Sequence, residues 1–419
     1  MSSHPPHLPP VLGLLDVGTS KIVCVMLARN DRGAYAVIGL GHQKSRGLKA
    51  SVIIDSDATE DAVRATLVQA EHMAGVALEH VVISAASGRL TSTHFAAGLN
   101  LNENHHSARP VTPPDLDRLI DAARRHAERD DRAALHLNFL ATRIDNQPIS
   151  GPVIGVPGRH LAMDVHAVTA DRAPLRHLLH VAERCQLTVA AVAPAPLASA
   201  LAVTTPEDRH SGTVVIDCGA GSTSLTQFVH GNLVAAHVIP IGSNHITYDL
   251  MRALDTSITE AERIKKKYAI QQLAQPAADD AVAYQPRADS HAHSNPTSKQ
   301  VTRAQISTII TSRVDALLRQ LRQRLDQSAI PSQPGSQILL TGGASLLVGL
   351  AERAAAILER AVRVAQPLPN GCLPGALLQP AFATVAGLQT IAFDRNLGLR
   401  LNSGHAHHTP NQAWLRQSL

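Results

Sequence analysis

Aromatic residues are scarce in this sequence: Phe, Trp and Tyr together make up 2% of its 419 residues, although hydrophobic residues make up 44%. We therefore expect a large core built from Ala, Val, Leu and Ile. No stretch of about 18 apolar residues occurs, so no membrane-spanning helix is predicted. Basic residues are scattered and not interleaved with aromatic ones, and the net charge is only +4. The sequence therefore predicts no nucleic-acid-binding surface.

Cysteine is rare as well. The four cysteines lie far apart and form no CxxC pair, so neither a zinc site nor a disulfide framework is indicated, and a reducing cytoplasm is expected. The first ten residues, MSSHPPHLPP, contain no basic segment followed by an apolar one. Residues 1–10 are therefore predicted to be a disordered leader and not a signal peptide.

The hydrophobic pattern predicts an α/β fold in a chain long enough for two or more domains. Residues 11–84 predict three strands, a helix over 59–74 with Thr59 as its cap, and a further strand. Strands and helices that alternate in this way suggest an α/β layer. We interpret this segment as the beginning of a first lobe, which continues over residues 166–205.

Residues 85–165 differ from this pattern, because short strands separated by polar residues surround one clear helix. Thr112 precedes that helix and Asp115 follows three residues later, which is the spacing of a capping box. We interpret this segment as a small α+β domain inserted into the first lobe.

The segment 212–242 repeats the opening pattern of a strand, an aspartate, a glycine-rich turn and two further strands. A duplicated α/β unit predicts two lobes that face each other across a cleft. The second lobe is assigned to 206–393, with a subdomain at about 244–330 that contacts nucleotide. Residues 274–300 are rich in Pro, Ala, Asp, Ser and His and are expected to form a mobile surface loop. A linker is expected over 394–409.

Two aspartates follow apolar strands and precede turns of small residues in the two halves of the repeat. Asp16 lies in LLDVGTSKI and Asp217 in VIDCGAGST. Successive backbone N–H groups in such turns bind anions, and the paired carboxylates would hold Mg²⁺ through water. The alternative is that each motif is an ordinary hairpin turn. The predicted phosphate-binding residues are Gly18, Thr19, Ser20, Lys21, Gly219, Gly221, Ser222 and Thr223.

A third motif occurs in ILLTGGASLLVGL, residues 338–350, where a buried strand is followed by Thr341, Gly342 and Gly343 and then by a helix. Two glycines at a strand-to-helix junction allow a nucleotide to lie against the backbone and the helix N-terminus. One such pair is weak evidence alone. In this order after the two aspartate turns, it predicts a nucleotide-binding cleft.

In these three motifs the sequence resembles the actin, Hsp70 and hexokinase superfamily, and within it the FtsA family of bacterial cell-division actin homologues. Further FtsA-like features are GLKASVIIDSDAT at 47–59, PLASALAV at 196–203, IPIGSNHITYDL at 239–250 and EAERIKKKYA at 260–269. The inserted domain also lies where FtsA carries its own distinctive domain. The resemblance implies an actin-like two-lobe fold with duplicated sheet and helix units, which binds ATP and Mg²⁺.

The resemblance also implies a role. Such a protein polymerises on the inner face of the cytoplasmic membrane, tethers the FtsZ ring to it, and helps to recruit later membrane division proteins. Glu262 and Lys265 would contact the ribose of ATP; the alternative is an exposed ion pair one helical turn apart. Arg303 and Arg313 are candidates for binding the partly acidic C-terminal peptide of FtsZ. The alternative is that their helix, predicted over 302–326, only packs on its lobe.

Some positions depart from the family pattern. Ala195 stands where many relatives carry an acidic residue, Ser243 where a second glycine is usual, and Ala344 where glycine is common. No carboxylate or glutamine in the connecting helix is placed to orient water. We therefore expect ATP binding with slow or undetectable hydrolysis, and no enzymatic role. The alternatives are a small-molecule kinase of the same superfamily and an actin-like protein of pilus assembly.

The last ten residues, PNQAWLRQSL (410–419), predict a short amphipathic helix. Trp414, Leu415 and Leu419 are its apolar residues, and tryptophan suits the headgroup boundary of a membrane. The placement resembles the membrane-targeting tail of FtsA, so we expect a peripheral protein of the cell inner membrane at the division site. The alternative is that Trp414 and Leu415 pack against the body of the protein.

Overall fold

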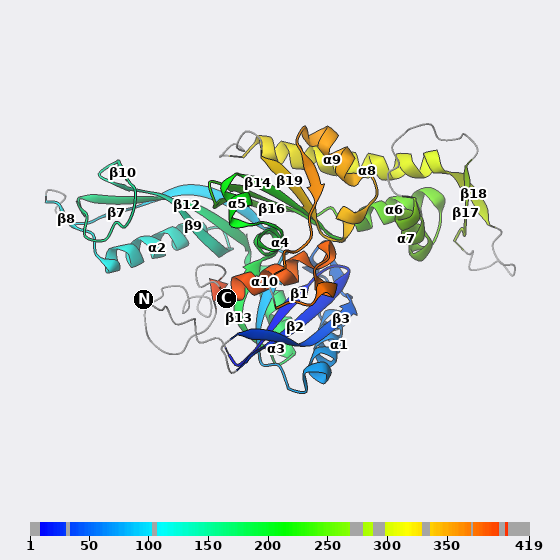
Figure 1. The fold of residues 1–419 in the computed structure, drawn as a ribbon, viewed down its shortest axis with the longest axis horizontal. Helices are drawn as coiled ribbons and strands as arrows, with labels where there is room; N and C mark the ends of the chain where they lie inside the picture. Colours follow the sequence, from blue (N-terminus) through cyan, green and yellow to red (C-terminus); the bar gives the residue numbers. More distant parts are fainter. Residues whose placement is uncertain are drawn as a thin grey trace.

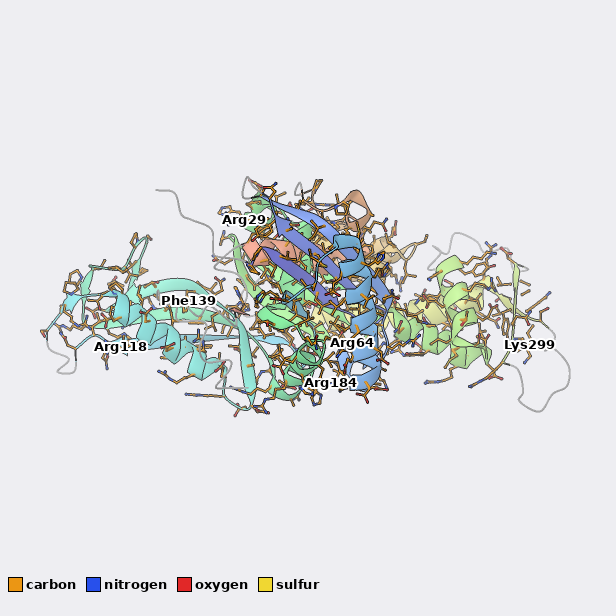
Figure 2. The ribbon with its side chains drawn as sticks, turned by 90° about the horizontal axis from the view of Figure 1, so that it is seen from below. Arg29, Arg64, Arg118, Phe139, Arg184 and Lys299 are labelled. Carbon is orange, nitrogen blue, oxygen red and sulfur yellow. The ribbon has the colours of Figure 1, made fainter. Side chains whose placement is uncertain are left out.

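The computed structural model describes residues 9–30, 34–102, 107–268, 280–287, 298–328, 336–369, 372–393 and 399–400. Two lobes, each built on one β-sheet, lie at the centre of an elongated molecule, and an inserted domain extends from one side of them (Figure 1). Arg118 of the inserted domain and Lys299 of the second lobe lie near opposite ends of the long axis (Figure 2).

The first lobe contains a six-stranded mixed sheet in the order β21-β13-β6-β1-β2-β3. β1 and β2 are antiparallel and are joined by the turn that follows Asp16, whereas β1, β6 and β13 run parallel. Helices α1 and α3 are joined by an ion pair, in which Arg184 Nε lies 2.6 Å from Glu60 Oε2 (Arg184 is labelled in Figure 2). The elements are β1 (Val11–Val17), β2 (Lys21–Arg29), β3 (Tyr35–Lys44), α1 (Ser56–Ala74), β6 (His80–Ala85), α3 (Arg172–Arg184), β13 (Thr188–Pro194), α10 (Ala383–Phe393) and β21 (Leu399–Arg400).

The second lobe contains a five-stranded sheet in the order β16-β15-β14-β19-β20. Its β14–β15 hairpin has the same plan as β1–β2, with Asp217 one residue before the end of the first strand. The elements are α4 (Ala195–Val203), α5 (Pro206–His210), β14 (Thr213–Cys218), β15 (Thr223–Val229), β16 (Asn232–Ile239), α6 (Ser243–Leu254), α7 (Ile258–Lys267), α8 (Arg303–Asp326), β19 (Gln337–Thr341), α9 (Leu350–Leu358) and β20 (Val362–Val364).

Helices α4 and α10 lie between the two sheets. α10 packs against β1 and β6 of the first lobe, α4 packs against β14 and β15 of the second, and the two helices pack against each other. Both are apolar on nearly all sides and almost fully buried, as is expected of helices enclosed on every face. These helices therefore connect the lobes beneath the cleft. The expected lobe boundaries differ here, because α4 was assigned to the first lobe but packs mainly on the second sheet, and α10 was assigned to the second lobe but packs on the first.

The start of α1 differs from the sequence-based expectation. The helix begins at Ser56, and Asp55 is its cap, since Asp55 Oδ1 accepts a hydrogen bond of 3.0 Å from Ala58 N–H. Thr59 is buried inside the first turn, where its hydroxyl donates to the Asp55 carbonyl oxygen at 2.7 Å. The Asp55 side chain accepts a hydrogen bond from an amide of the first turn that would otherwise lack a partner, so Asp55 and not Thr59 caps the helix.

The inserted domain has a four-stranded sheet in the order β10-β9-β12-β7, with helix α2 packed on it. The capping box is present, since Asp115 accepts from Thr112 N–H at 2.9 Å. β12 pairs with β7 and β9 along its length, so the expected boundary at residue 165 falls inside a strand. The elements are β7 (Thr91–Asn100), β8 (Arg109–Pro110), α2 (Pro113–Ala127), β9 (Arg132–Ile144), β10 (Gln147–Ile149), β11 (Pro157–Gly158) and β12 (His160–Asp171).

The expected mobile loop over 274–300 contains ordered structure. β17 (Ala281–Tyr284) pairs antiparallel with β18 (Lys299–Thr302), and Val282, Tyr284 and Val301 are buried. Hydrophobic residues at every second position give this hairpin one packed face, which the polar composition of the segment concealed.

The expected linker over 394–409 also contains ordered backbone, because β21 pairs antiparallel with β13 at the edge of the first sheet. The predicted tail helix with Trp414, Leu415 and Leu419 lies outside the described residues. Within the described ranges, none of the helices combines the length and hydrophobicity that a bilayer crossing demands.

Candidate functional site

The two aspartate turns have the same backbone structure. In the first, Gly18 N–H donates to the Lys21 carbonyl oxygen at 3.0 Å. In the second, Gly219 N–H donates to the Ser222 carbonyl oxygen, also at 3.0 Å. The repeat seen in the sequence is therefore a structural repeat, with one turn contributed by each lobe.

Two glycines allow the segments to converge. A β-carbon at Gly221 would lie 2.3 Å from Thr19 Oγ1, so the two turns are in contact across the cleft. Gly342 has a φ of +82°, and a β-carbon there would lie 2.2 Å from Asp217 Oδ1. Only glycine combines that backbone conformation with that close approach. The third motif therefore lies directly against the second aspartate.

These segments line a cavity of about 540 Å³, which is in the range of small-molecule and cofactor sites. Most of the residues predicted from the sequence face this one cavity, including residues more than 300 positions apart in the chain. They are Asp16, Gly18, Thr19, Ser20, Lys21, Asp217, Gly219, Gly221, Ser222, Glu262, Lys265, Gly342 and Gly343.

Thr223 does not line the cavity, contrary to the sequence-based assignment. It is 1% exposed, and its hydroxyl donates to the Ile241 carbonyl oxygen at 2.8 Å. In the β14–β15 pair, Asp217 lies opposite Ser224, whereas Thr223 lies opposite Cys218. Cross-strand partners share a face of the sheet. Ser224 therefore shares the face of the aspartate and lines the cavity in place of Thr223.

Thr341 is also absent from the cavity wall. It is fully buried, and its hydroxyl lies 3.4 Å from the Pro380 carbonyl oxygen, which also accepts from Gly342 N–H at 3.0 Å. The segment at Pro380 thus covers Thr341 and separates it from the cleft.

Asp16 and Asp217 stand at the floor of the cavity, each partly open to it. Ser84 donates a hydrogen bond of 2.6 Å to Asp16, and Thr384 lies 3.4 Å from the Asp217 carboxylate. Burial raises the pKa of Asp217 to about 6, and the charge of Asp16 contributes to this rise. Burial also raises the pKa of Asp16. The two carboxylates are therefore close enough to repel each other, and a shared cation would relieve this repulsion.

The donors suit a hydrated magnesium ion better than a bare one. Among the described residues, no group of three or more His, Cys, Asp or Glu side chains is arranged to hold a metal ion. Mg²⁺ commonly keeps several waters and binds through one or two carboxylates together with substrate phosphates. Asp16 and Asp217 fit that pattern, and hydroxyl groups surround them.

Lys21 supplies positive charge next to this pair. Burial lowers the pKa of its ammonium group, while the charges of Asp16 and Asp217 raise it. Its Nζ lies 3.7 Å from the centroid of the Phe382 ring, a distance typical of a cation–π contact. The Phe382 ring thus holds the lysine at the cavity, where it feels the charges of the aspartates of both lobes.

Glu262 and Lys265 form an ion pair one helical turn apart, as in the alternative, but the pair is only partly exposed and belongs to a hydrogen-bond network. Lys265 Nζ lies 2.6 Å from Glu262 Oε2, and the lysine side chain is only 5% exposed. The hydroxyl of Thr247 donates to Glu262 at 2.7 Å and accepts from Lys265 at 2.9 Å. Both charged groups line the cavity, so they are placed to contact a ligand there.

Several cavity residues were missed by sequence reasoning. Ser84 lies beside Asp16 because β6 is the parallel neighbour of β1, which strand alternation could have indicated. Helix α6 begins on the second turn, where Ser243 N–H donates to the Gly219 carbonyl oxygen at 3.0 Å. Ser51 reaches the cavity from a short hairpin within the FtsA-like segment 47–59, in which no site residue was assigned from the sequence. The missed polar residues that line the cavity are Ser51, Ser224, Ser243, Asn244, Lys266 and Thr384. Ser84 is buried and bonds to Asp16 without lining the cavity itself.

Arg303 and Arg313 lie outside this cavity and both have acidic neighbours. Arg313 forms a two-point ion pair with Asp249 of α6, at 2.6 and 3.0 Å. Arg303 lies 2.8 Å from Asp280 and remains 40% exposed. Binding of an acidic peptide to Arg313 would have to displace Asp249, whereas Arg303 is more accessible.

Comparison with known proteins agrees with this geometry. The family model for cell division protein FtsA matches residues 214–387, and the model for the SHS2 domain inserted in FtsA matches residues 88–169. Cell division protein FtsA of Rhizobium meliloti is 35% identical over 90% of this chain and 86% of its own. FtsA of Neisseria meningitidis is 30% identical over 90% of this chain and 89% of its own.

Solved structures share the fold at low sequence identity. The PilM-PilN type IV pilus biogenesis complex matches with a TM-score of 0.62 and 18% identity, covering 93% of this chain and 100% of that one. MreB5 of Spiroplasma citri bound to ADP matches with a TM-score of 0.52 and 13% identity, covering 91% and 96%. The fold is therefore actin-like, with two lobes and an inserted domain. The sequence similarity between this chain and the FtsA relatives extends over nine tenths of the chain, at 30–35% identity. The chain thus belongs to the FtsA family of cell division proteins.

Proposed function

We propose that this protein binds Mg-ATP between its lobes and uses the nucleotide to stabilise a conformation that polymerises at the division site. The observation that carries the proposal is the convergence of the Asp16 turn, the Asp217 turn and Gly342 on one cavity. Nucleotide in MreB5, which shares the fold, supports the same use of the cleft. In this role ATP shifts a conformational equilibrium because it binds one state more tightly.

Each group in the cavity has a proposed task. The backbone of the two turns binds the phosphates, and Lys21 offsets their charge. Asp16 and Asp217 hold Mg²⁺ through water, and the ion in turn supplies charge neutralisation at the phosphates. Glu262 and Lys265 contact the ribose hydroxyls, since the carboxylate accepts and the ammonium donates hydrogen bonds.

Hydrolysis is proposed to be slow or undetectable. The carboxylates among the described lining residues are Asp16, Asp217 and Glu262. The first two are assigned to the ion, and the third is engaged by Lys265 and Thr247. Ala195, at the start of α4, lines the cavity with a methyl group where a polar side chain could orient water. The proposed role of the nucleotide is therefore to bind and stabilise one conformation, without rapid hydrolysis. A sustained multi-turnover ATPase rate of the purified protein would contradict the proposal of slow hydrolysis.

At the membrane, we propose that the terminal segment with Trp414, Leu415 and Leu419 inserts its apolar face into the lipid surface. Three buried side chains contribute at most roughly 5–7 kcal/mol, and ordering a segment this short costs much of that. One tail therefore binds weakly, and a polymer with many tails binds strongly. The second lobe is proposed to hold the C-terminal peptide of FtsZ, with Arg303 better placed than Arg313, and the lobes and the inserted domain are proposed to form the contacts within the filament.

One experiment tests this function directly: co-sedimentation with liposomes, with and without Mg-ATP, of the full chain and of a version that ends at Asn402. That truncation keeps β21 and removes the predicted tail helix. We expect ATP to increase the liposome-dependent sedimentation of the full chain, measured against samples without liposomes, and to have no effect on that of the truncated one. Equal sedimentation of both proteins would contradict membrane attachment through the tail. Family membership favours this role over the pilus-assembly and kinase alternatives.

A further inference from the structure

Ser51 lies in the two-residue turn of a short hairpin, and this turn reaches the proposed nucleotide cavity from the first lobe. Strands β4 (Leu48–Lys49) and β5 (Val52–Ile53) pair antiparallel, and Ala50 and Ser51 form the turn between them. Ser51 lines the cavity, although it belongs to none of the three nucleotide motifs.

The turn has a backbone conformation that its residues disfavour. φ is +48° at Ala50 and +64° at Ser51. A two-residue hairpin of this kind needs positive φ at both positions, and Asn and Gly adopt it most readily. Non-glycine residues held in this region cost free energy and are concentrated at functional sites. At this site the consequence is that a hydroxyl group, which glycine would lack, occupies the tip.

The Ser51 side chain bridges the two lobes, and its backbone bonds to the turn of its own lobe. Ser51 Oγ lies 2.8 Å from Ser222 Oγ in the second turn, and Ser51 N–H donates to Thr19 Oγ1 in the first turn at 2.9 Å. The hydroxyl oxygens of Thr19 and Ser51 are 3.5 Å apart. Three hydroxyls from three separate segments therefore meet where the two turns touch, and we name Thr19, Ser51 and Ser222 the hydroxyl cluster.

The hairpin is firmly attached to its own lobe. At its base, Ser45 N–H donates to the Ser20 carbonyl oxygen at 3.1 Å, and Ile54 N–H donates to the Gly47 carbonyl oxygen at 2.8 Å. Leu48 and Ile53 pack against the core of the first lobe. A contact at Ser51 therefore acts on the first lobe as a whole.

We propose that Ser51 contacts the terminal phosphate of a bound nucleoside triphosphate and that this contact holds the two lobes closed. The inference rests on the proposed function, because it requires a nucleotide in the cavity. Hydroxyls donate hydrogen bonds to phosphate oxygens, and the hydroxyl cluster lies between the two turns assigned to the phosphates. A diphosphate lacks the group that Ser51 contacts, so Ser51 distinguishes ATP from ADP and couples that difference to lobe closure.

Three variants separate the hydroxyl from the backbone. Ser51→Ala removes the hydroxyl and keeps the strained turn. Ser51→Gly removes the hydroxyl and relieves the turn. Ala50→Gly relieves the neighbouring position and leaves the hydroxyl in place, and Ala50 does not line the cavity, so it is the matched control.

The measurement is isothermal titration of the full chain with Mg-ATP and with Mg-ADP, which gives the ratio of the two dissociation constants. In both Ser51 variants we expect the preference for ATP over ADP to fall about tenfold. This factor corresponds to the loss of one hydrogen bond to a charged group. Ala50→Gly should keep the wild-type ratio.

Two results would overturn the inference. One is an unchanged ratio in both Ser51 variants while ATP still binds. The other is an equal loss of preference in Ala50→Gly, which would assign the effect to the backbone. If the wild-type protein binds no ATP, the proposed function itself fails, and the two failures are thus distinguishable.

Discussion

A β-carbon at Gly387 of α10 would lie 1.7 Å from the carbonyl oxygen of Ala198 in α4, so these two helices are in direct backbone contact. The contact joins the lobes, because α10 packs on the first sheet and α4 on the second. Any side chain at Gly387 would force the helices apart.

We therefore expect Gly387→Ala to destabilise the protein by about 1–3 kcal/mol, the usual cost of overpacking a core. The thermal unfolding midpoint, followed by circular dichroism, should fall by several degrees. Gly375→Ala is the control, since no atom lies within 4 Å of its added β-carbon. Equal midpoints for the two variants would contradict the close contact.

The affinity for Mg-nucleotide should depend on pH through Asp217. Its pKa is raised to about 6 by burial, and only the ionised carboxylate can hold the cation. Affinity should therefore be constant above about pH 7 and fall by up to about tenfold per pH unit below 6. Titration calorimetry from pH 5 to 8 measures this. Asp217→Asn should bind weakly and lose the part of the pH dependence that comes from the Asp217 carboxylate. A wild-type profile no steeper than that of the variant would refute the assignment.

A group of histidines at the junction of the inserted domain and the second lobe should make stability fall in acid. Burial lowers the pKa of His136 on β9 and of His237 on β16 to about 4. His94 and His166 lie beside them with tilted rings whose centroids are 4.9 Å apart, and His166 is fully buried. The positive charge of Arg324 also lowers the pKa of His237.

Because the unfolded chain takes up these protons near pH 6.5 and the folded chain near 4, the stability is fully present above 6.5 and is lost as the pH falls towards 4. Each of the two histidines should cost about 1 kcal/mol at pH 5.5. Urea unfolding at pH 7.5 and 5.5 checks this. His136→Gln should lose less stability on acidification than the wild type. His177→Gln, at an exposed position on α3, should behave like the wild type.

The proposed ribose contact can be separated from phosphate binding by comparing ATP with inorganic triphosphate, which has no ribose. Glu262→Gln should weaken ATP binding about tenfold, because a charged hydrogen-bond acceptor is lost, and should leave triphosphate binding nearly unchanged. Lys267→Gln, an exposed lysine on the same helix, is the control. A similar loss for both ligands would indicate that Glu262 acts on the phosphates or on the fold.

Local patterns in the chain were sufficient for the strands, the turns and the repeat. An apolar run that ends in aspartate and small residues specifies a strand and a tight turn without reference to the rest of the molecule, and for this reason the turns at Asp16 and Asp217 were predicted correctly. The hairpin β17–β18 was missed because only two or three buried side chains distinguish it from a polar loop.

The composition of the cavity was decided by tertiary structure. Which side of a strand a residue faces depends on register, so Ser224 and not Thr223 stands beside Asp217. Thr341 was removed from the cleft by the segment at Pro380, which follows it by 39 residues. Ser51 became part of the site only because a strained hairpin brings it against Ser222, 171 residues away.

The sequence by itself thus determined the chemistry available to this protein: two acidic turns, a glycine pair and the family to which they belong. These follow from short-range backbone preferences. The tertiary structure decided which side chains meet, because contacts between the lobes depend on the packing of α4 on α10 and on the register of both sheets, and neither is encoded in any single segment.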